Sequence, residues 1–369
     1  HQRGLFSDGG GEVSPRAGGQ TKKVAGFARA RGAPGPPRPL RFLEECGGMS
    51  MAACIGKKLL SMIPLALIVS IILFGLINLL PGNAAMAILG DSGNLEQVEQ
   101  LEAKLGLDQP VYIQYINWLK GVCTGDLGTS VLTGQPVIDR IAERMPVTFE
   151  LIVLSVVFAA AVGVPLGIIC AVRRNRASDY ILSSVSIIGV AMPAFWVGML
   201  LIMLFSIKLH WLPASGYTPF FENPVENLRS MALPVFATGI ALAATIVRQT
   251  RSAVLDVLGQ DYMMTAKSKG IRYRTQLWRH ALKNALIPVI TAISMQIAGM
   301  IGGSVVIETV FLLPGMGKSM VDAIFQRDYP IVMGEALVIA VFIILLNTLV
   351  DVIYIFVDPR ISRSGKKGR

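Results

Sequence analysis

The chain has 369 residues, of which 53% are apolar and 16% charged, and its formal net charge is +10. This balance is typical of a membrane protein, and the positive excess fits loops beside anionic lipid rather than a soluble nucleic-acid-binding face. The three histidines lie on different predicted segments without a metal-ligand spacing. We therefore expect no metal site, no cofactor and no nucleic-acid partner.

The first segment, 1–50, differs from the rest of the chain. Residues 1–48 hold eleven Gly and five Pro and show no apolar periodicity. Such a segment cannot bury enough surface to offset its ordering entropy. We predict either a disordered tail or a non-native extension that precedes a start at Met49 or Met51.

Six long apolar stretches follow, and a helix of about 20 apolar residues crosses the hydrocarbon core. The stretches are 59–80, 151–172, 180–207, 231–247, 284–307 and 331–357. The sequence thus predicts an all-α membrane protein with six transmembrane helices. Residues 51–145 would form the first helix and an outer segment, and 146–358 the remaining transmembrane domain.

Charge alternates across the predicted membrane. The segment 248–283 has eight basic residues against two acids, 359–369 is a basic tail, and 81–146 has eight acids against four bases. By the positive-inside rule, both termini and 248–283 are cytoplasmic and 81–146 faces out. The outer segment predicts two helices, 94–106 and 111–122, which either pack on the rim of the bundle or dock an outer partner.

The cytoplasmic segment 248–283 carries the main mechanistic signal. Residues 261–269 have helical character, and Gly270 is placed to end that helix. A second helix follows, with one apolar face formed by Leu277, Trp278, Ala281, Leu282 and Ala285. The pair of helices could lie on lipid headgroups or insert into a groove on a partner, and the pattern alone slightly favours lipid.

Polar groups inside the spans are candidates for the translocation pathway, because they are costly there. The candidates are Gln296, Glu308 and Asp351. Small residues at Gly299, Gly302 and Gly303 would allow either close helix packing or an unwound pathway wall.

Residues 315–319 read GMGKS and imitate the end of a phosphate-binding loop. That motif needs a glycine where Leu312 stands, and it needs a strand before it. We do not predict a nucleotide site here.

Six motifs in chain order resemble the inner-membrane permease family of dipeptide and oligopeptide importers, the transmembrane subunits of ATP-binding-cassette (ABC) transporters. They are LPG at 80–82, LGLDQPVYIQY at 105–115, GDLGTS at 125–130, DYMMTAKSKG at 261–270, RHALKNALIPVIT at 279–291 and ETVFLLPGMG at 308–317. The resemblance implies a type I ABC importer permease fold, multi-pass in the bacterial inner membrane. It also implies that the chain is not an enzyme, since separate subunits hydrolyse ATP.

In this family the loop around Gly270 docks into the ATPase. The resemblance assigns that coupling role to Asp261, Thr265, Ala266, Gly270, Trp278, His280, Leu282 and Lys283. The loop departs from the general permease consensus at Met264 and Thr265, and Lys283 stands where the wider superfamily has proline. The implied partners are a homologous second permease, two cytoplasmic ATP-binding subunits, an extracytoplasmic substrate-binding protein and membrane lipid.

The expected cargo is a di- or oligopeptide, with glutathione or a nickel chelate as alternatives that the sequence does not separate. A secondary transporter is the competing class, but such proteins typically show internal repeats, and none is visible. A non-transporting scaffold would leave the helix pair around Gly270 unexplained.

Overall fold

The computed structural model describes residues 51–79, 96, 99–100 and 108–357. This part is helical, with one isolated β-bridge between Thr129 and Pro136. The predicted tails 1–50 and 359–369 and nearly all of the predicted helix 94–106 lie outside the described residues.

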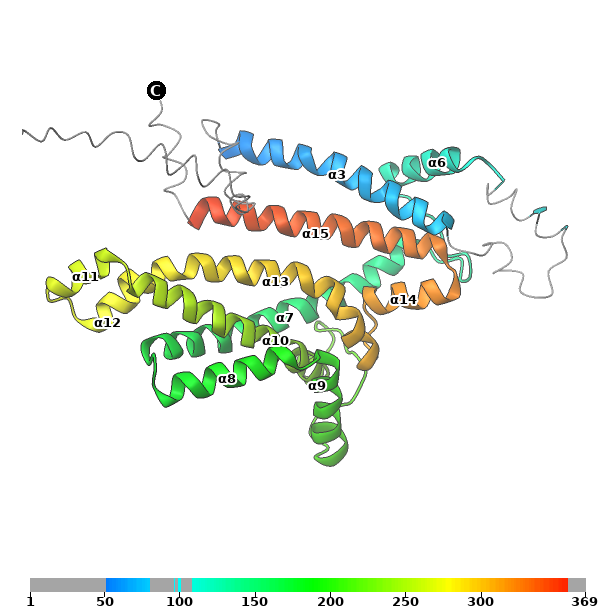
Figure 1. Cartoon of the computed structure of the whole chain (residues 1–369). Helices are drawn as coiled ribbons and strands as arrows, with labels where there is room; N and C mark the ends of the chain where they lie inside the picture. The colour runs from blue at the N-terminus through cyan, green and yellow to red at the C-terminus, as the bar shows by residue number, and fades with distance from the viewer. Residues whose placement is uncertain (1–50, 80–95, 97–98, 101–107, 358–369) are drawn as a thin grey trace, which may run out of the picture.

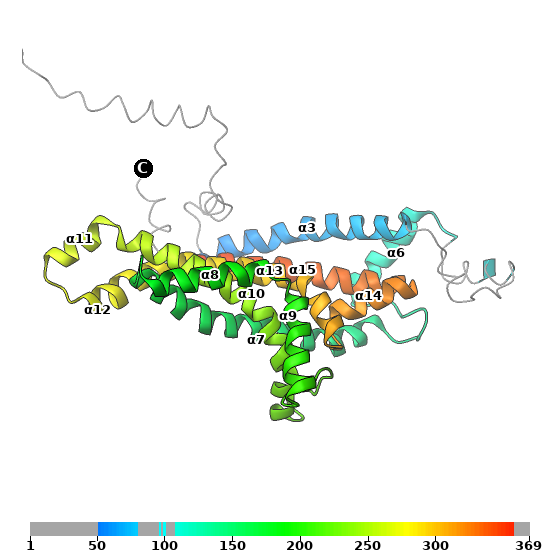
Figure 2. The ribbon, with the colours of Figure 1, turned by 60° about the horizontal axis from the view of Figure 1, so that its bottom comes forward.

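The long helices run along one common axis (Figures 1 and 2). They are α3 (Met51–Leu79), α7 (Val137–Val172), α8 (Ala177–Ala191), α10 (Pro224–Leu258), α13 (Leu282–Val310) and α15 (Tyr329–Val357). Helix α3 begins and α15 ends at the same end of the bundle. The described chain therefore passes along the bundle an even number of times.

The third predicted span, 180–207, is wrong as a single straight helix. After α8, Met192 takes an extended backbone before Pro193, and the chain continues as α9 (Ala194–Leu201) and the π-helix η2 (Ile202–Lys208). This second part is bent by 99° from α8, and Figure 1 shows α9 standing out from the bundle. The cause is local, because proline disfavours helical backbone at the residue before it.

Two spans are longer than their apolar cores. Helix α7 has 36 residues and begins well before the predicted start at 151, and α10 has 35 residues and continues through the beginning of the segment 248–283. That part was predicted as loop because of its charges, yet Val254 in it is fully buried. The added parts carry charged residues that have partners: Arg140 of α7 lies 3.9 Å from Glu335, and Arg251 of α10 pairs with Asp179.

The membrane architecture is confirmed, but the exact number of spans is not. Among the described residues, α7, α10 and α15 are long and apolar enough to cross a membrane. Counting the bent pair α8 and α9 and the 49° bend within 273–310 each as one span raises the number to five. Helix α3 adds a shorter apolar stretch, Leu60–Leu76.

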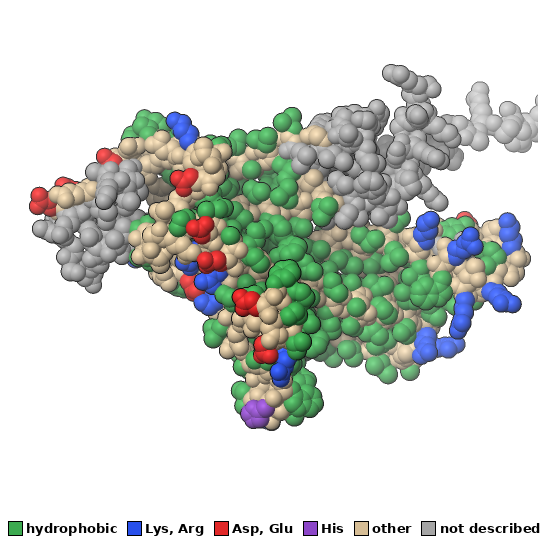
Figure 3. Space-filling model, turned by 180° about the vertical axis from the view of Figure 1, so that it is seen from behind, with side chains coloured by type: hydrophobic (Ala, Val, Ile, Leu, Met, Phe, Trp, Pro, Cys, Tyr) green, Lys and Arg blue, Asp and Glu red, His purple; other side chains and the backbone are tan. Residues whose placement is uncertain are grey.

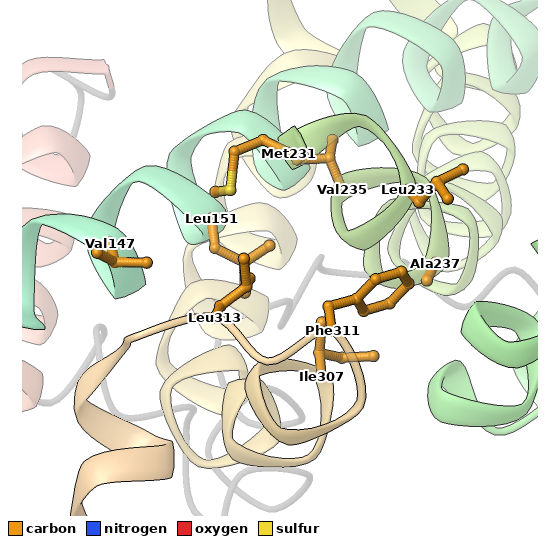
Figure 4. Packing of buried hydrophobic residues seen from close by; sticks show 9 residues of the cluster. All are labelled: Val147, Leu151, Met231, Leu233, Val235, Ala237, Ile307, Phe311 and Leu313. Atoms are coloured by element: carbon orange, nitrogen blue, oxygen red, sulfur yellow. The ribbon is translucent and has the colours of Figure 1, made fainter. Parts of the chain in front are cut away.

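Glycines allow the central helices to approach closely. A Cβ built on Gly167 of α7 would lie 2.6 Å from the Cβ of Thr250 in α10, and one on Gly163 would lie 2.8 Å from that of Ile246. Toward the other end, which is predicted to face out, a cluster named here the outer cluster joins α7, α10 and the end of α13 (Figure 4). Its buried members are Val147, Leu151, Met231, Leu233, Val235, Ala237, Ile307, Phe311 and Leu313.

Two shorter helices lie at this same end of the bundle (Figure 1). Helix α6 (Val111–Thr124) ends at Gly125, whose φ is +85°, so the predicted helix 111–122 is confirmed. It is tied to α3 by a 2.9 Å hydrogen bond between the hydroxyls of Ser70 and Tyr115. The second helix, α14 (Met316–Gln326), lies between α13 and α15.

Candidate coupling site and polar groups of the bundle

A tip made of α11 (Asp261–Ser268), α12 (Tyr273–Thr275) and the π-helix η3 (Gln276–Ala281) extends beyond one end of the bundle (Figure 1). The predicted helix 261–269 and its stop are confirmed. Gly270 has φ +71°, and its N–H donates to the Lys267 carbonyl over 3.0 Å. A Cβ on Gly270 would meet nothing within 4 Å, so the left-handed backbone is what favours glycine there.

The tip has a fixed shape because it has its own core. Met263 of α11 and Leu277 and Ala281 of η3 are buried in one cluster with Val254 of α10. The Gln276 side chain donates to the Ile271 carbonyl over 2.6 Å, which closes the loop between α11 and η3. The tip is therefore continuous with the bundle on both sides, through α10 and through α13.

The predicted coupling residues divide into two groups. Ala266 and Leu282 are buried within the chain, and the exposed ones are Asp261, Thr265, Gly270, Trp278 and Lys283. The side chain of His280 lies outside those that the structure describes. The buried pair can act only by shaping the tip, while the exposed group is free to touch another molecule.

The prediction that Trp278 shares one face with Leu277 and Ala281 is wrong, since those two side chains are buried and that of Trp278 is 65% exposed. Residues Gln276–Ala281 form a π-helix, so the 3.6-residue period behind that prediction does not hold there. Gln276 takes a buried position beside Leu277 instead.

The surface of the tip combines large apolar side chains with a basic surround. Tyr262, Met264, Tyr273 and Trp278 are exposed. Seen from behind, Lys and Arg gather at this end, Asp and Glu gather at the other, and apolar side chains cover the middle (Figure 3). Aromatic residues, Met and Arg are the residue types enriched at protein–protein interfaces.

At the opposite end, Glu308 of α13 is fully buried and fully engaged. Its carboxylate accepts hydrogen bonds from the Thr148 hydroxyl and from the backbone N–H of Lys318, both over 2.8 Å. A Cβ on Gly315 would lie 2.4 Å from the carboxyl carbon of Glu308. The GMGKS segment thus wraps a carboxylate of its own chain at the N-terminus of α14, where a phosphate-binding loop holds phosphate.

Glu335 of α15 is also fully buried, but neither of its oxygens accepts a hydrogen bond from the part of the chain that the structure describes. The Arg140 side chain lies 3.9 Å from one of these oxygens and donates to the Ser319 hydroxyl over 2.9 Å. Glu150 of α7 accepts a 2.8 Å hydrogen bond from the Tyr217 hydroxyl. Burial and the neighbouring Glu150 raise the pKa of Tyr217, so this hydroxyl stays a donor.

The predicted pathway residues are not brought together. Gln296 is half-buried on α13, and Glu308 lies about 18 Å further along the same helix. The side chain of Asp351 lies outside the described set. A Cβ on Gly299, Gly302 or Gly303 would meet nothing within 4 Å, so the predicted close approach at these glycines does not occur within the described chain.

One ion pair, between a buried carboxylate and a partly exposed guanidinium, was not predicted from the sequence. Asp179, in the first turn of α8, accepts hydrogen bonds of 2.7 and 2.8 Å from Nε and Nη2 of Arg251 in α10. The sequence offered one indication that Asp179 is paired: it is an acid at the edge of an apolar stretch, just after three arginines. Its partner is 72 residues away and could not be found from spacing.

Comparison with known proteins identifies the family. The model of binding-protein-dependent transport system inner membrane components matches residues 163–363, and the model of the N-terminal part of such components matches 51–152. A putative peptide transport system permease protein of Brucella suis biovar 1 (strain 1330) is 42% identical over 311 residues, covering 84% of this chain and 99% of that protein.

Two further curated relatives have different names. A dipeptide transport system permease protein of Alkalihalophilus pseudofirmus is 36% identical over 332 residues, 85% of this chain and all of that protein. A glutathione transport system permease protein of Escherichia coli (strain K12) is 39% identical over 305 residues, 83% of this chain and 97% of that protein.

Among solved structures, the fold resembles that of the MetNI methionine ABC transporter in inward-facing conformations. The TM-score is 0.50 at 17% identity, and the match covers 59% of this chain and 96% of that one. Together with the relatives, the matches establish what the chain is: a member of the family of inner membrane components of binding-protein-dependent transport systems, the permease subunits of ABC importers.

Proposed function

We propose that this permease carries short peptides across the inner membrane and that separate cytoplasmic ATPase subunits drive it by binding the tip formed by α11, α12 and η3. The observation that carries the proposal is the exposed apolar surface on a tip of fixed shape, above all Met264 and Trp278. A lipid-bound helix pair has no need for its own buried core, whereas a docking element does. The partners are a second homologous permease, two ATPases and an outer substrate-binding protein.

The peptide assignment follows the relatives named for peptide and dipeptide transport, which are 42% and 36% identical to this chain. A peptide carries both an ammonium and a carboxylate, and a matching permease site would need free charges. In this chain the carboxylates of Glu308 and Asp179 are both engaged by internal donors, and the buried carboxylate of Glu335 already faces Arg140 at 3.9 Å. Selection of the cargo therefore resides mainly in the substrate-binding protein, and the permease passes what that protein delivers.

Uptake by a deletion strain tests the cargo. Loss of the gene is expected to abolish uptake of labelled di- to pentapeptides, which no longer have a pathway, and to leave sugar and inorganic phosphate uptake intact. Glutathione uptake is measured in parallel, because a relative named for glutathione transport is 39% identical. Normal peptide and glutathione uptake together with a failure to acquire nickel would replace the peptide assignment with a metal chelate.

The orientation proposed for the chain places the basic tip in the cytoplasm, where the positive-inside rule puts Lys and Arg. Single cysteines are introduced into a version of the chain from which its four cysteines have been removed. Gln100→Cys and Glu222→Cys are expected to react with an impermeant maleimide in intact cells, and Gln260→Cys only after permeabilisation. Labelling of position 260 in intact cells would invert the orientation and remove the tip from any cytoplasmic ATPase.

A further inference from the structure

The ion pair between Asp179 and Arg251 is the main polar link between α8 and α10. Asp179 is only 2% exposed, and its carboxylate also accepts a 3.1 Å hydrogen bond from the Asn175 N–H and a 3.4 Å bond from the Ser183 hydroxyl. It is one of two buried side chains in α8, the other being Ser186. The remaining side chains of α8 are all at least partly exposed, and α8 also packs along α10 and touches α7.

Partly buried ion pairs add little net stability, because desolvation and the ordering of the side chains offset the attraction between the charges. Their distinctive contribution is geometry, since a two-bond contact between a guanidinium and a carboxylate allows only one relative placement of the two helices. Apart from this pair, α8 approaches α10 closely at Gly189, where a Cβ would lie 3.2 Å from that of Ala244.

Arg251 sits on the helix that leads directly into the tip. Helix α10 ends at Leu258, about two turns beyond Arg251, and α11 begins at Asp261. Hydrogen bonds from Gly259 N–H to Leu255 O and from Met263 N–H to Gln260 O bridge the junction. A displacement of the tip is therefore passed to α10 and reaches Arg251.

Asp179 sits on the helix that leads to the other end of the bundle. Helix α8 continues through the 99° bend into α9, where a Cβ on Gly198 would lie 3.0 Å from Cε2 of Phe311. Leu201, Ile202 and Phe205 pack on the same outer cluster, which also holds Leu313 (Figure 4). Phe311 and Leu313 belong to the turn that positions the Glu308 and Gly315 contact.

We propose that Asp179 and Arg251 are positioning residues that make α8 move with α10, so that a displacement of the tip reaches the outer cluster through α9. This rests on the proposed function, in which an ATPase supplies the displacement. The ion pair thus links the motion of the cytoplasmic end of the permease to that of its outer end. We expect that breaking it uncouples ATP hydrolysis from transport while the complex stays assembled.

The test uses the complete transporter in proteoliposomes and measures peptide imported per ATP hydrolysed. Asp179→Asn keeps the size of the side chain and removes the charge, so we expect an assembled complex with ATP hydrolysis retained. The import per ATP should fall about tenfold, which is within the range of typical coupling between sites. Arg251→Lys, which keeps the charge but loses the two-bond geometry, should give an intermediate ratio.

A reversible cross-link separates positioning from folding. Gly189→Cys and Ala244→Cys are added to the Asp179→Asn chain. Their Cβ atoms would lie 3.2 Å apart, close to the separation of about 3.5 to 4.5 Å between the Cβ atoms of a disulfide. Oxidation should join α8 to α10 again and restore the ratio, and reduction should lower it again. The matched control is Asp322→Asn, which breaks the exposed 2.6 Å pair with Lys318 at the other end and should leave the ratio unchanged.

A wild-type ratio in Asp179→Asn, or a cross-link that leaves the ratio low, overturns the proposal. Failure of the Asp179→Asn complex to assemble also overturns it, because the pair would then serve folding. Failure of the proposed function gives a different result, since the unmodified transporter itself would then import no peptide on ATP hydrolysis.

Discussion

Replacing Gly315 by alanine is expected to remove most of the folded permease from the membrane. The backbone at Gly315 has φ −91°, which alanine adopts freely, so the effect is purely steric. The added Cβ would lie 2.4 Å from the carboxyl carbon of Glu308 and 2.5 Å from one of its oxygens. A Cβ does not approach non-bonded atoms this closely in real structures, so the fully buried carboxylate would have to move and give up its hydrogen bonds.

The expected cost combines two effects. Overpacking a well-filled site costs about 1 to 3 kcal/mol, and a buried polar group that loses its partner costs about 1 to 3 kcal/mol. Moving the carboxylate breaks its bonds to the Thr148 hydroxyl and to the Lys318 N–H, and Thr148 also accepts from the Met316 N–H over 2.9 Å. Against a total stability of about 5 to 15 kcal/mol for a typical domain, this is a large loss.

The measurement is the fraction of monodisperse protein after detergent extraction and heating. Gly315→Ala should lower the midpoint of this curve by several degrees and reduce the amount in the membrane. Gly75→Ala is the matched control, because a Cβ there meets nothing within 4 Å. Equal midpoints for the two variants would show that the turn relaxes around the new methyl group and that Glu308 is not held as tightly as its contacts indicate.

Sequence reasoning predicted the elements whose signals are local. The end of α11 was found because Gly270 takes positive φ, α6 was found from the spacing of its apolar residues, and α13 and α15 follow long apolar runs. The bend after α8 was missed although Pro193 was visible. Apolar residues continue on both sides of it, and a hydropathy pattern does not show that the helix axis changes direction.

The site was predictable in its position along the chain but not in its contacts. Glu308 was selected as a buried ionisable group, yet its role depends on Thr148, which is 160 residues away. Trp278 was grouped on one face with Leu277 and Ala281, which it does not share, because a π-helix cannot be recognised from a periodic pattern. Ala266 was assigned to the docking surface, whereas the structure buries it beneath the tip, where a change of size would alter the shape of the tip.

Replacing Trp278, one of the exposed coupling residues, by alanine is expected to weaken binding of the ATPase. The Trp278 side chain is 65% exposed at the tip, and it is not a member of the buried cluster that holds the tip together. Trp278→Ala should therefore leave the permease folded and inserted. Exposed tryptophans that become buried on binding often dominate an interface, with losses of 2 kcal/mol or more.

A loss of about 2 kcal/mol raises the dissociation constant of the ATPase about thirtyfold. The measurement is the affinity of the purified ATPase subunit for the permease in nanodiscs, with uptake of labelled peptide by cells as the second readout. Trp211→Ala is the matched control, because Trp211 is 62% exposed and lies outside the tip, between η2 and α10. The control should bind the ATPase and support uptake as the unmodified chain does.

If Trp278→Ala keeps full ATPase affinity, the aromatic surface of the tip does not form the docking contact. If the same variant also associates more weakly with anionic vesicles, the tip lies on the lipid headgroups. The exposed ring of Trp278 would then anchor a helix pair that also carries the exposed basic residues Lys267, Lys269 and Arg272.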